Sequence, residues 1–334
     1  MKSALFYKKI KNSVLQCELC PRYCVIKNSE VGNCGVRKNI QGKLYSLVYG
    51  KPCSINIDPI EKKPLYHFLP GSESFSIGTV GCNFHCLNCQ NYEISQAKFE
   101  GVNSIDLPPK KVVEQALKNK CKSISYTYNE PTIFCEYMLD TAQLAKKKRI
   151  KNVIVSNGFI NEKPLLELCK YIDAANIDLK AFDDNFYKKI CDARLDPILN
   201  TLKILYKKKI WLELTNLLIP KLNDDNKQIR KLCLWIKENL DENVPLHFSR
   251  FFPMYKASNF QATNFETLKN AYEIAKETGL KYVYLGNIES NYENTYCPNC
   301  KNLLIERSSF SVNKVNIRKN KCIKCNQKIV CIWK

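Results

Sequence analysis

Three cysteines stand close together in the stretch Gly81–Asn91, which reads GCNFHCLNCQN. Cys82, Cys86 and Cys89 have the spacing C-x3-C-x2-C. Iron–sulfur clusters are normally held by four thiolates. Three thiolates on one tight loop can bind three irons of a cubane cluster and leave the fourth iron open to a small molecule, as catalytic metal sites keep one position open. A zinc loop, or chance spacing in a cysteine-rich chain, is the alternative interpretation.

Two further groups of cysteines flank this loop. The N-terminal group is Cys17, Cys20, Cys24 and Cys34. Glycine and proline residues between its members supply the turns of a metal-binding loop, and four such thiolates can hold zinc or a second iron–sulfur cluster. The C-terminal group is Cys297, Cys300, Cys322 and Cys325. Its two C-x2-C pairs resemble a zinc ribbon, so we expect a structural zinc ion there.

Alternating strand-like and helix-like runs must position the three-cysteine loop. The strand-like runs are residues 75–80, 123–127, 152–156, 174–179, 211–219, 245–252 and 281–285. Apolar residues at helical spacing lie between them. This alternation implies an α/β fold with parallel strands and crossover helices, closed into a complete or partial barrel. The loop follows the first strand, and barrels carry their active sites at the carboxyl ends of the strands.

The chain of 334 residues is predicted to have three parts. These are an N-terminal Cys-rich extension (1–70), a barrel (71–288) and a zinc-ribbon-like module (289–334). The segment Gly50–Gly71 is rich in turn residues and poorly periodic, and we expect it to be a long ordered segment that leads to the first strand. Thr263 and Glu266 predict a capping box for a helix that ends at Thr278.

The composition limits the classes of partner. The chain has 52 lysine and arginine residues against 32 acidic residues, a net charge of +20. The lysines are spread along the chain and gather at predicted helix ends, so nucleic acid is not expected as a partner. No run of about 18 apolar residues occurs, so no membrane partner is expected either. Without a secretory signal, the 18 cysteines predict metal ligation in a reducing cytoplasm rather than disulfides.

Polar residues close several predicted strands. They are Asn129 and Glu130 after the second strand, Ser156 and Asn157 at the third, Asp178 and Lys180 in the fourth, and His247 in the sixth. Asp178 and Lys180 share one face because side chains alternate along a strand. A carboxylate and an ammonium facing inward are costly unless they are paired or bind a ligand. The pair is either a structural ion pair or part of a binding site, and His247 is either a core histidine or a member of that site.

Several motifs together resemble one family. The three-cysteine loop, YTYNEP, SNG, DLK and LHFSRFFP are similar to the activase-like branch of the radical S-adenosylmethionine (SAM) enzymes, which includes the pyruvate formate-lyase activating enzymes. CELCPRYC…GNCGVR, EKKPLYHFLPG and YCPNC…CIKCNQKIVCIW extend the resemblance, over nearly the whole chain, to the AmmeMemoRadiSam system radical SAM enzymes. Asn88 stands where many radical SAM enzymes carry an aromatic residue. Activases usually have Gly-Gly-Glu at residues 128–130 and often Asp-Thr-Asn-Gly at 155–158, and some insert ferredoxin-like cysteines that are missing here.

The resemblance implies a partial (β/α)6 barrel of the TIM type with a [4Fe–4S] cluster on the three-cysteine loop. SAM would bind the open iron, and its reductive cleavage would give methionine and a 5′-deoxyadenosyl radical that abstracts hydrogen from a substrate. Carboxylate and amide oxygens suit the ammonium of SAM, Lys180 suits its carboxylate, and His247 its ribose or adenine. The predicted SAM contacts are Asn129, Glu130, Ser156, Asn157, Asp178, Lys180 and His247.

The implied partners are a one-electron reductant such as ferredoxin or flavodoxin, and the Memo-type and AMMECR-type proteins after which that group is named. A narrower hypothesis is an activase that installs a glycyl radical on a protein partner. The alternative from another class is a non-catalytic, zinc-rich basic adaptor that binds nucleic acid or protein. The substrate is not identified by the sequence.

Overall fold

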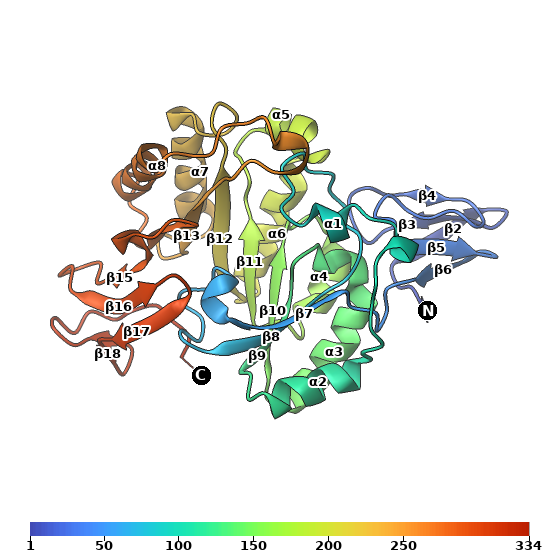
Figure 1. The fold of residues 1–334 in the computed structure, drawn as a ribbon, viewed down its shortest axis with the longest axis horizontal. Coiled ribbons are helices and arrows are strands. Elements are labelled where there is room, and N and C mark those ends of the chain that lie inside the picture. The colour runs from blue at the N-terminus through green and yellow to red at the C-terminus, as the bar shows by residue number, and fades with distance from the viewer. Residues whose placement is uncertain (334) are drawn as a thin grey trace.

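One eight-stranded sheet forms the centre of the molecule (Figure 1). The structure is a computed structural model that describes residues 1–333. The strand order is β14-β13-β12-β11-β10-β9-β8-β7, with β8 to β14 parallel and β7 antiparallel to β8. The strands are β7 (Ser54–Pro59), β8 (Glu73–Gly78), β9 (Ser123–Tyr126), β10 (Lys151–Ser156), β11 (Ala174–Asp178), β12 (Trp211–Leu218), β13 (Leu246–Arg250) and β14 (Val283–Gly286). The predicted α/β class is confirmed, and each parallel strand overlaps one of the predicted runs.

Six helices connect consecutive parallel strands. They are α2 (Pro109–Lys118), α3 (Cys135–Lys147), α4 (Glu162–Leu168), α6 (Asp196–Lys207), α7 (Asn226–Asn239) and α8 (Phe265–Glu277). On α7, Ile229, Leu232 and Ile236 are buried at helical spacing, which explains why this segment packs as a helix against the sheet. Within residues 1–333, β7 and β14 are the edges of the sheet and do not pair. Closure into a partial TIM-type barrel therefore stays a prediction.

One strand was missed, and one local expectation was wrong. The segment after Gly50 contains β7, which pairs with β8 along its whole length. The helix α8 is capped by Asn264, whose side chain accepts from the Thr267 N–H at 2.8 Å. Thr263 does not cap, because its hydroxyl donates to the Leu218 carbonyl at 2.6 Å.

A small N-terminal module packs beside the sheet, at the blue end of Figure 1. Its strands are β1 (Lys2–Ser3), β2 (Tyr7–Lys11), β3 (Val14–Cys17), β4 (Val25–Ile26), β5 (Arg37–Ile40) and β6 (Lys43–Ser46). Arg37 on β5 reaches Glu136 on α3, with Nη1 2.9 Å from Oε1 and 3.0 Å from Oε2. Both side chains are only 2% exposed. This buried ion pair joins the module to the helical layer.

A second module follows β14, at the red end of Figure 1. Its strands are β15 (Thr295–Tyr296), β16 (Leu303–Ser308), β17 (Ser311–Val315), β18 (Ile317–Arg318) and β19 (Lys321–Cys322). It has its own small core, which includes Leu304, Ile305 and Ile329. Ile332 of this module pairs with the segment before β8, since the Leu69 N–H donates to the Ile332 carbonyl at 2.7 Å.

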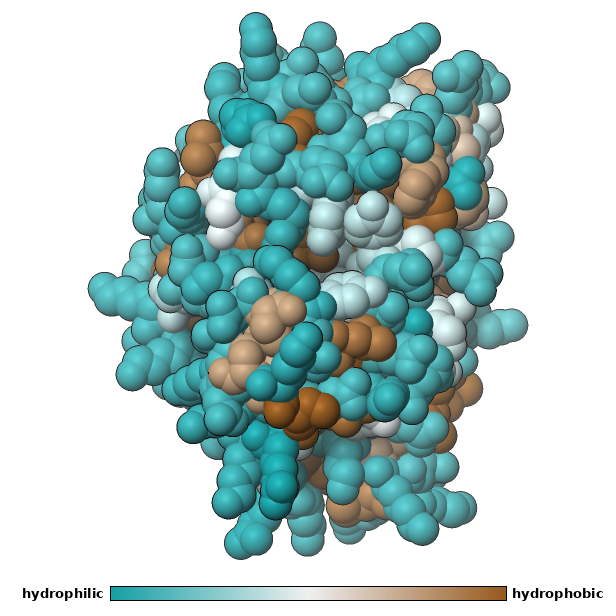
Figure 2. All heavy atoms as spheres, turned by 90° about the vertical axis from the view of Figure 1, so that its left-hand side faces the viewer, coloured by the Kyte–Doolittle hydropathy of each residue, from teal (hydrophilic) through white to brown (hydrophobic). Residues whose placement is uncertain are grey.

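The boundaries at residues 70/71 and 288/289 stay predictions, and the β7–β8 ladder crosses the first of them. None of the helices within residues 1–333 combines the length and the apolar character needed to cross a membrane. The predicted cytoplasmic location is not tested by this. Figure 2 shows that the face formed by the C-terminal module and its surroundings is mostly hydrophilic, with scattered apolar residues.

Replacing Glu136 by Gln should lower the free energy of unfolding by about 3–5 kcal/mol, because it leaves the Arg37 guanidinium buried without a counter-charge. The matched control is Glu277→Gln, which removes the carboxylate of the exposed Arg230–Glu277 pair and should change stability little. Chemical unfolding of both variants measures the difference, and equal losses would contradict the anchoring role of the buried pair.

Candidate functional site

A cavity of about 430 Å³ lies at the carboxyl ends of the parallel strands. The three cysteines of the loop and all but one of the predicted SAM contacts line it. They are Cys82, Cys86, Cys89, Asn129, Glu130, Ser156, Asn157, Asp178 and Lys180. The structure thus brings the three-cysteine loop together with the polar ends of β9, β10 and β11, as expected where parallel strands end at one edge.

His247 is the one predicted contact that does not line this cavity. It lies on β13 with its Nε2 2.7 Å from the Glu213 carboxylate, and it is 3% exposed. Its ring packs edge-on against Tyr66, with ring centroids 4.7 Å apart. His247 lines a neighbouring chamber instead.

The backbone of the three-cysteine loop is held from several sides. Gly81 has a φ of +95°, and a side chain there would place its Cβ 2.5 Å from the Cys34 carbonyl oxygen. Glycine is therefore required both by the left-handed backbone and by the close approach of the N-terminal module. The amide of Asn129 clamps the start of the loop, because it donates to the Gly81 carbonyl at 2.7 Å and accepts from the Thr79 N–H at 3.2 Å.

Hydrogen-bond donors surround the three sulfurs. The Phe84 N–H lies 3.3 Å from the Cys82 Sγ, and the Ser95 hydroxyl lies 3.0 Å from the Cys89 Sγ. Burial raises the pKa of the Cys82 and Cys89 thiols. A hydrogen bond from Cys191 lowers the pKa of the Cys86 thiol. Donors of this kind favour metal-bound thiolates and tune the potential of a cluster.

Asp178 and Lys180 carry opposite charges into the cavity. The Lys180 Nζ lies 2.8 Å from Asp178 Oδ2, and the two side chains are 18% and 34% exposed. Burial opposes the charge of Lys180, but Asp178 and then the thiols of Cys86 and Cys191 raise its pKa well above the usual value. Lys180 is therefore charged at neutral pH and lies beside the sulfurs.

Glu130 has its acceptors occupied by the protein. Its carboxylate accepts from the Thr132 N–H at 2.9 Å, the Ser156 hydroxyl at 2.8 Å and the Asn157 N–H at 2.8 Å. The side chain of Asn157 in turn donates to Asn83, inside the cysteine loop, at 2.9 Å. Glu130 thus orients the end of β10 toward the loop, with both of its oxygens already hydrogen-bonded to the protein.

Sequence reasoning missed Cys191, which belongs to none of the three predicted cysteine groups. The His85 N–H donates to the Cys191 carbonyl at 3.1 Å, and the Leu87 N–H donates to the preceding carbonyl of Ile190 at 2.9 Å. His85 and Leu87 are the two chain neighbours of Cys86, so these bonds bring the backbone of Cys191 next to Cys86. Cys191 is fully buried and outside the lining of the cavity. Its spacing along the chain carries no signal for this long-range contact.

Sequence reasoning also missed Lys62 and Lys63, which line the same cavity. Both ammonium groups bind Asp58, Lys62 at 3.0 Å and Lys63 at 2.6 Å, and the Tyr128 hydroxyl donates to the same carboxylate. They were missed because β7 was not predicted, and the pairing of β7 with β8 brings these residues to the cavity.

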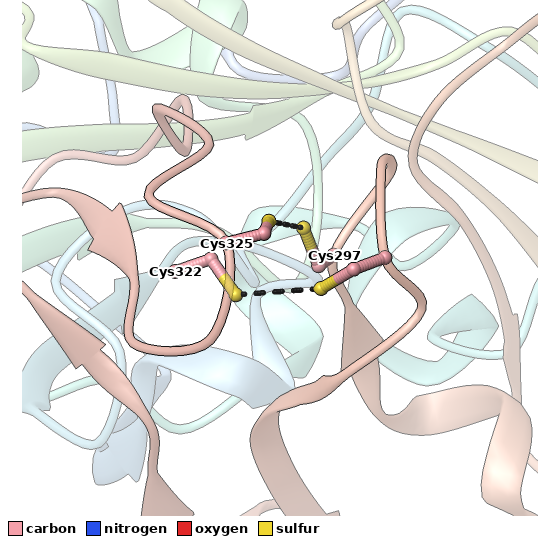
Figure 3. A group of neighbouring side chains, drawn as sticks. Cys297, Cys322 and Cys325 are labelled. Atoms are coloured by element: carbon pink, nitrogen blue, oxygen red, sulfur yellow. Dashed lines mark hydrogen bonds between the residues drawn. The ribbon is translucent and has the colours of Figure 1, made fainter.

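The four C-terminal cysteines converge (Figure 3). Their sulfur atoms all lie within 4.8 Å of one another, with Cys297 Sγ 3.6 Å from Cys325 Sγ and Cys300 Sγ 3.7 Å from Cys322 Sγ. Tetrahedral zinc with Zn–S bonds of about 2.3 Å places its sulfurs ~3.8 Å apart. The Gln327 N–H lowers the pKa of Cys325 to about 6, which favours the thiolate that a metal needs. This group has the geometry of a single-ion site.

The four N-terminal cysteines line one enclosed cavity of about 20 Å³. Within residues 1–333 their sulfurs are not all within 4.8 Å of one another, unlike those of the C-terminal group. Burial raises the pKa of Cys20 to about 12 and that of Cys34 to about 11. The predicted metal at this group stays a prediction.

Comparison with known proteins connects this site to a family. Residues 76–233 match the model of the Radical SAM superfamily. The chain is 45% identical to the uncharacterized protein MJ0808 of Methanocaldococcus jannaschii, over 98% of this chain and 99% of that one. It is 23% identical to the pyruvate formate-lyase-activating enzyme of Clostridium pasteurianum, over 59% of this chain and 87% of that one.

A solved radical SAM methyltransferase from Sphaerobacter thermophilus shares the fold with a TM-score of 0.50 at 10% identity, covering 64% of this chain and 67% of that one. The matched residues 76–233 contain the three-cysteine loop and the ends of β9, β10 and β11. Sequence, fold and position of the loop agree, and the chain belongs to the Radical SAM superfamily.

Proposed function

We propose that this chain holds a [4Fe–4S] cluster on Cys82, Cys86 and Cys89 and cleaves SAM reductively. When bound, these cofactors supply a 5′-deoxyadenosyl radical that abstracts hydrogen from a substrate. The observation that carries the proposal is that three thiols of one loop share a cavity with Asp178 and Lys180. Soft ligands for iron thus lie beside opposite charges that suit the zwitterionic methionyl end of SAM.

The donor set fits a cluster better than a zinc ion. Within residues 1–333, only the C-terminal group brings three or more ligand atoms within 4.8 Å of one another. The sulfurs of the three-cysteine loop are therefore spread more widely than the ~3.8 Å between ligands of one tetrahedral zinc ion. The donors at Phe84 and Ser95 support thiolate ligands. Membership of the superfamily favours an enzyme over a non-catalytic adaptor.

The protein's own residues have distinct roles in this proposal. Lys180 binds the SAM carboxylate and Asp178 its ammonium. Asn129 fixes the start of the loop, and Glu130 holds Ser156 and Asn157 in place, so these residues position the site. The six strand–helix units support a partial (β/α)6 barrel as the scaffold. A direct role for His247 toward the ribose would require the cofactor to reach the neighbouring chamber.

An activase is the narrower form of this proposal. Similarity to proteins named pyruvate formate-lyase-activating enzyme and 4-hydroxyphenylacetate decarboxylase activating enzyme supports it. A glycyl-radical signal by EPR on a candidate partner would test it. Reduction by a ferredoxin or flavodoxin follows from the one-electron chemistry, and the Memo-type and AMMECR-type partners stay predictions.

The reaction predicts that anaerobically reconstituted, reduced protein converts SAM into 5′-deoxyadenosine and methionine. Cys86→Ala should abolish the product because it removes one ligand of the cluster. Cys169→Ala, the same change at a half-buried thiol after α4, should leave it intact. Chromatography detects 5′-deoxyadenosine. A cluster-loaded wild type that makes none, with an EPR spectrum unchanged by SAM, would overturn the proposal.

Lys180→Ala should weaken SAM binding about ten- to a hundred-fold, since a charge-assisted hydrogen bond in a desolvated site contributes roughly 1.5–3 kcal/mol. The iron and sulfide content should stay close to that of the wild type. The control is Lys188→Ala, which removes the ammonium of the exposed Lys188–Asp184 pair outside the cavity. Titration of the cluster's EPR signal with SAM measures both, and wild-type affinity in folded Lys180→Ala protein would contradict the role of this ammonium.

We further propose zinc at the C-terminal group and a separate metal at the N-terminal group. Replacing Cys297 and Cys300 by Ser should remove one zinc ion per chain, lower the melting temperature and spare the cluster's EPR signal. Replacing Cys17 and Cys20 by Ser should remove a different, fixed amount of metal. Elemental analysis of each purified variant counts the ions. Loss of the cluster signal with zinc retained in the first variant would refute the assignment.

A further inference from the structure

A second chamber adjoins the main cavity. It has a volume of about 250 Å³. The two spaces share the lining residues Pro64, Thr215, Ser249, Asn287 and Phe310. A molecule in the chamber is therefore separated from the cavity of the three-cysteine loop by a single layer of side chains at most.

Three carboxylates line this chamber, although the chain as a whole has a net charge of +20. Glu61 is 1% exposed and Glu293 is 5% exposed, while Glu289 lies at the exposed rim. No lysine or arginine is among the lining residues. Burial raises the pKa of Glu293 to about 7, and the neighbouring Glu289 adds to this rise. The chamber is an acidic compartment in a basic protein.

Glu61 has one carboxylate oxygen without a partner. Its Oε1 accepts from the Gly71 N–H at 2.9 Å and lies 3.7 Å from the Arg307 Nε. Its Oε2 is buried and has no hydrogen-bond partner within the described residues. The Arg307 Nη atoms donate to the Tyr66 carbonyl at 2.7 Å and to the Thr295 hydroxyl at 2.8 Å. The Arg307 Nε faces Glu61 but is too far away for a hydrogen bond, so Arg307 balances part of the charge of Glu61 and leaves Oε2 unpaired. A buried acceptor of this kind is costly until a donor reaches it.

The wall that closes the chamber comes from the C-terminal module. Ser309 and Phe310, in the turn between β16 and β17, line it, and Phe310 lines the main cavity as well. Phe310 is 43% exposed. An aromatic face beside carboxylates is a favourable surface for a cation. The C-terminal module thus builds part of the wall of both spaces.

We propose that this chamber binds a cationic nitrogen of the substrate, an ammonium or a guanidinium, through Glu61 and Glu293. This inference rests on the proposed function, and it names the class of substrate whose C–H bond lies at the boundary with the main cavity. The chamber is smaller than the about 300–1,000 Å³ of pockets for drug-sized ligands, so it takes one side chain or one small amine. The nitrogen belongs to a lysine or arginine side chain of a peptide or to a free amine.

The test is calorimetric titration of the full-length, anaerobically reconstituted protein with pentylamine and, as the uncharged match, pentan-1-ol. We expect the alcohol to bind at least about ten-fold more weakly, because it has no charge for the carboxylates. Acetyl-lysine methylamide and acetyl-norleucine methylamide form the peptide arm. Tighter binding of the lysine derivative than of pentylamine identifies a peptide as the source of the nitrogen, and the reverse identifies a free amine.

Glu61→Gln and Glu293→Gln should each weaken binding of the favoured amine about ten-fold or more. Glu238→Gln, the same change at an exposed site on α7, should not. Because Glu61 lies near Arg307, Glu293→Gln provides the answer if Glu61→Gln fails to fold. Equal binding of amine and alcohol, or wild-type affinity in the folded variants, overturns the inference. If the protein binds the amine in a Glu61-dependent way but cleaves no SAM, the inference about the chamber holds and only the proposed function is refuted.

Discussion

The carboxylate of Glu213 joins the parts of this molecule. It lies on β12, fully buried, and accepts from the backbone N–H groups of Tyr66 and His67 at 2.9 and 2.7 Å. It also binds Trp211 and His247. Burial disfavours its charge, but the hydrogen bond from His247 and its neighbours lower the pKa of this carboxyl group below the usual value. One buried anion thus fixes the backbone of Tyr66 and His67 against the sheet. Those residues hold the C-terminal module, because His67 Nδ1 lies 2.7 Å from the Val330 carbonyl oxygen.

The same arrangement explains how the cavity can hold charged groups at fixed positions. Its polar side chains are bound to one another before any ligand arrives, so little reorganisation is needed on binding. Glu130 shows this most clearly, since three donors bind its carboxylate and it holds Ser156 and Asn157 in place. Lys180 and Asp178 differ, because each is bound mainly to the other and both are partly exposed. A zwitterion can replace that mutual contact with two contacts of its own.

The sequence was informative where a signal is local. Strand-like runs located β8 to β14, and residue spacing identified the three-cysteine loop and the C-terminal group. The sequence was uninformative where a residue's structure is decided by a contact with a residue far away in the chain. The strand β7 has an exposed Ile57 and weak periodicity, and it is stabilised by its ladder with β8. His247 lies on a strand whose end faces the main cavity, but its ring is hydrogen-bonded to Glu213 and does not line that cavity. Thr263 has the right type for a cap, but a tertiary carbonyl competes for its hydroxyl.

The wall that Phe310 contributes has a consequence for the order of folding. Arg307 and Tyr66, which connect that wall to the sheet, are 241 residues apart in the chain. Closing so long a loop carries a large entropic cost that is recovered only after the intervening strands have assembled. The contacts of the three-cysteine loop span fewer residues than this, since Asn129 is 48 residues from Gly81 and Asn157 is 74 residues from Asn83. We therefore expect the contacts that close the chamber to form no earlier than those that shape the cysteine loop.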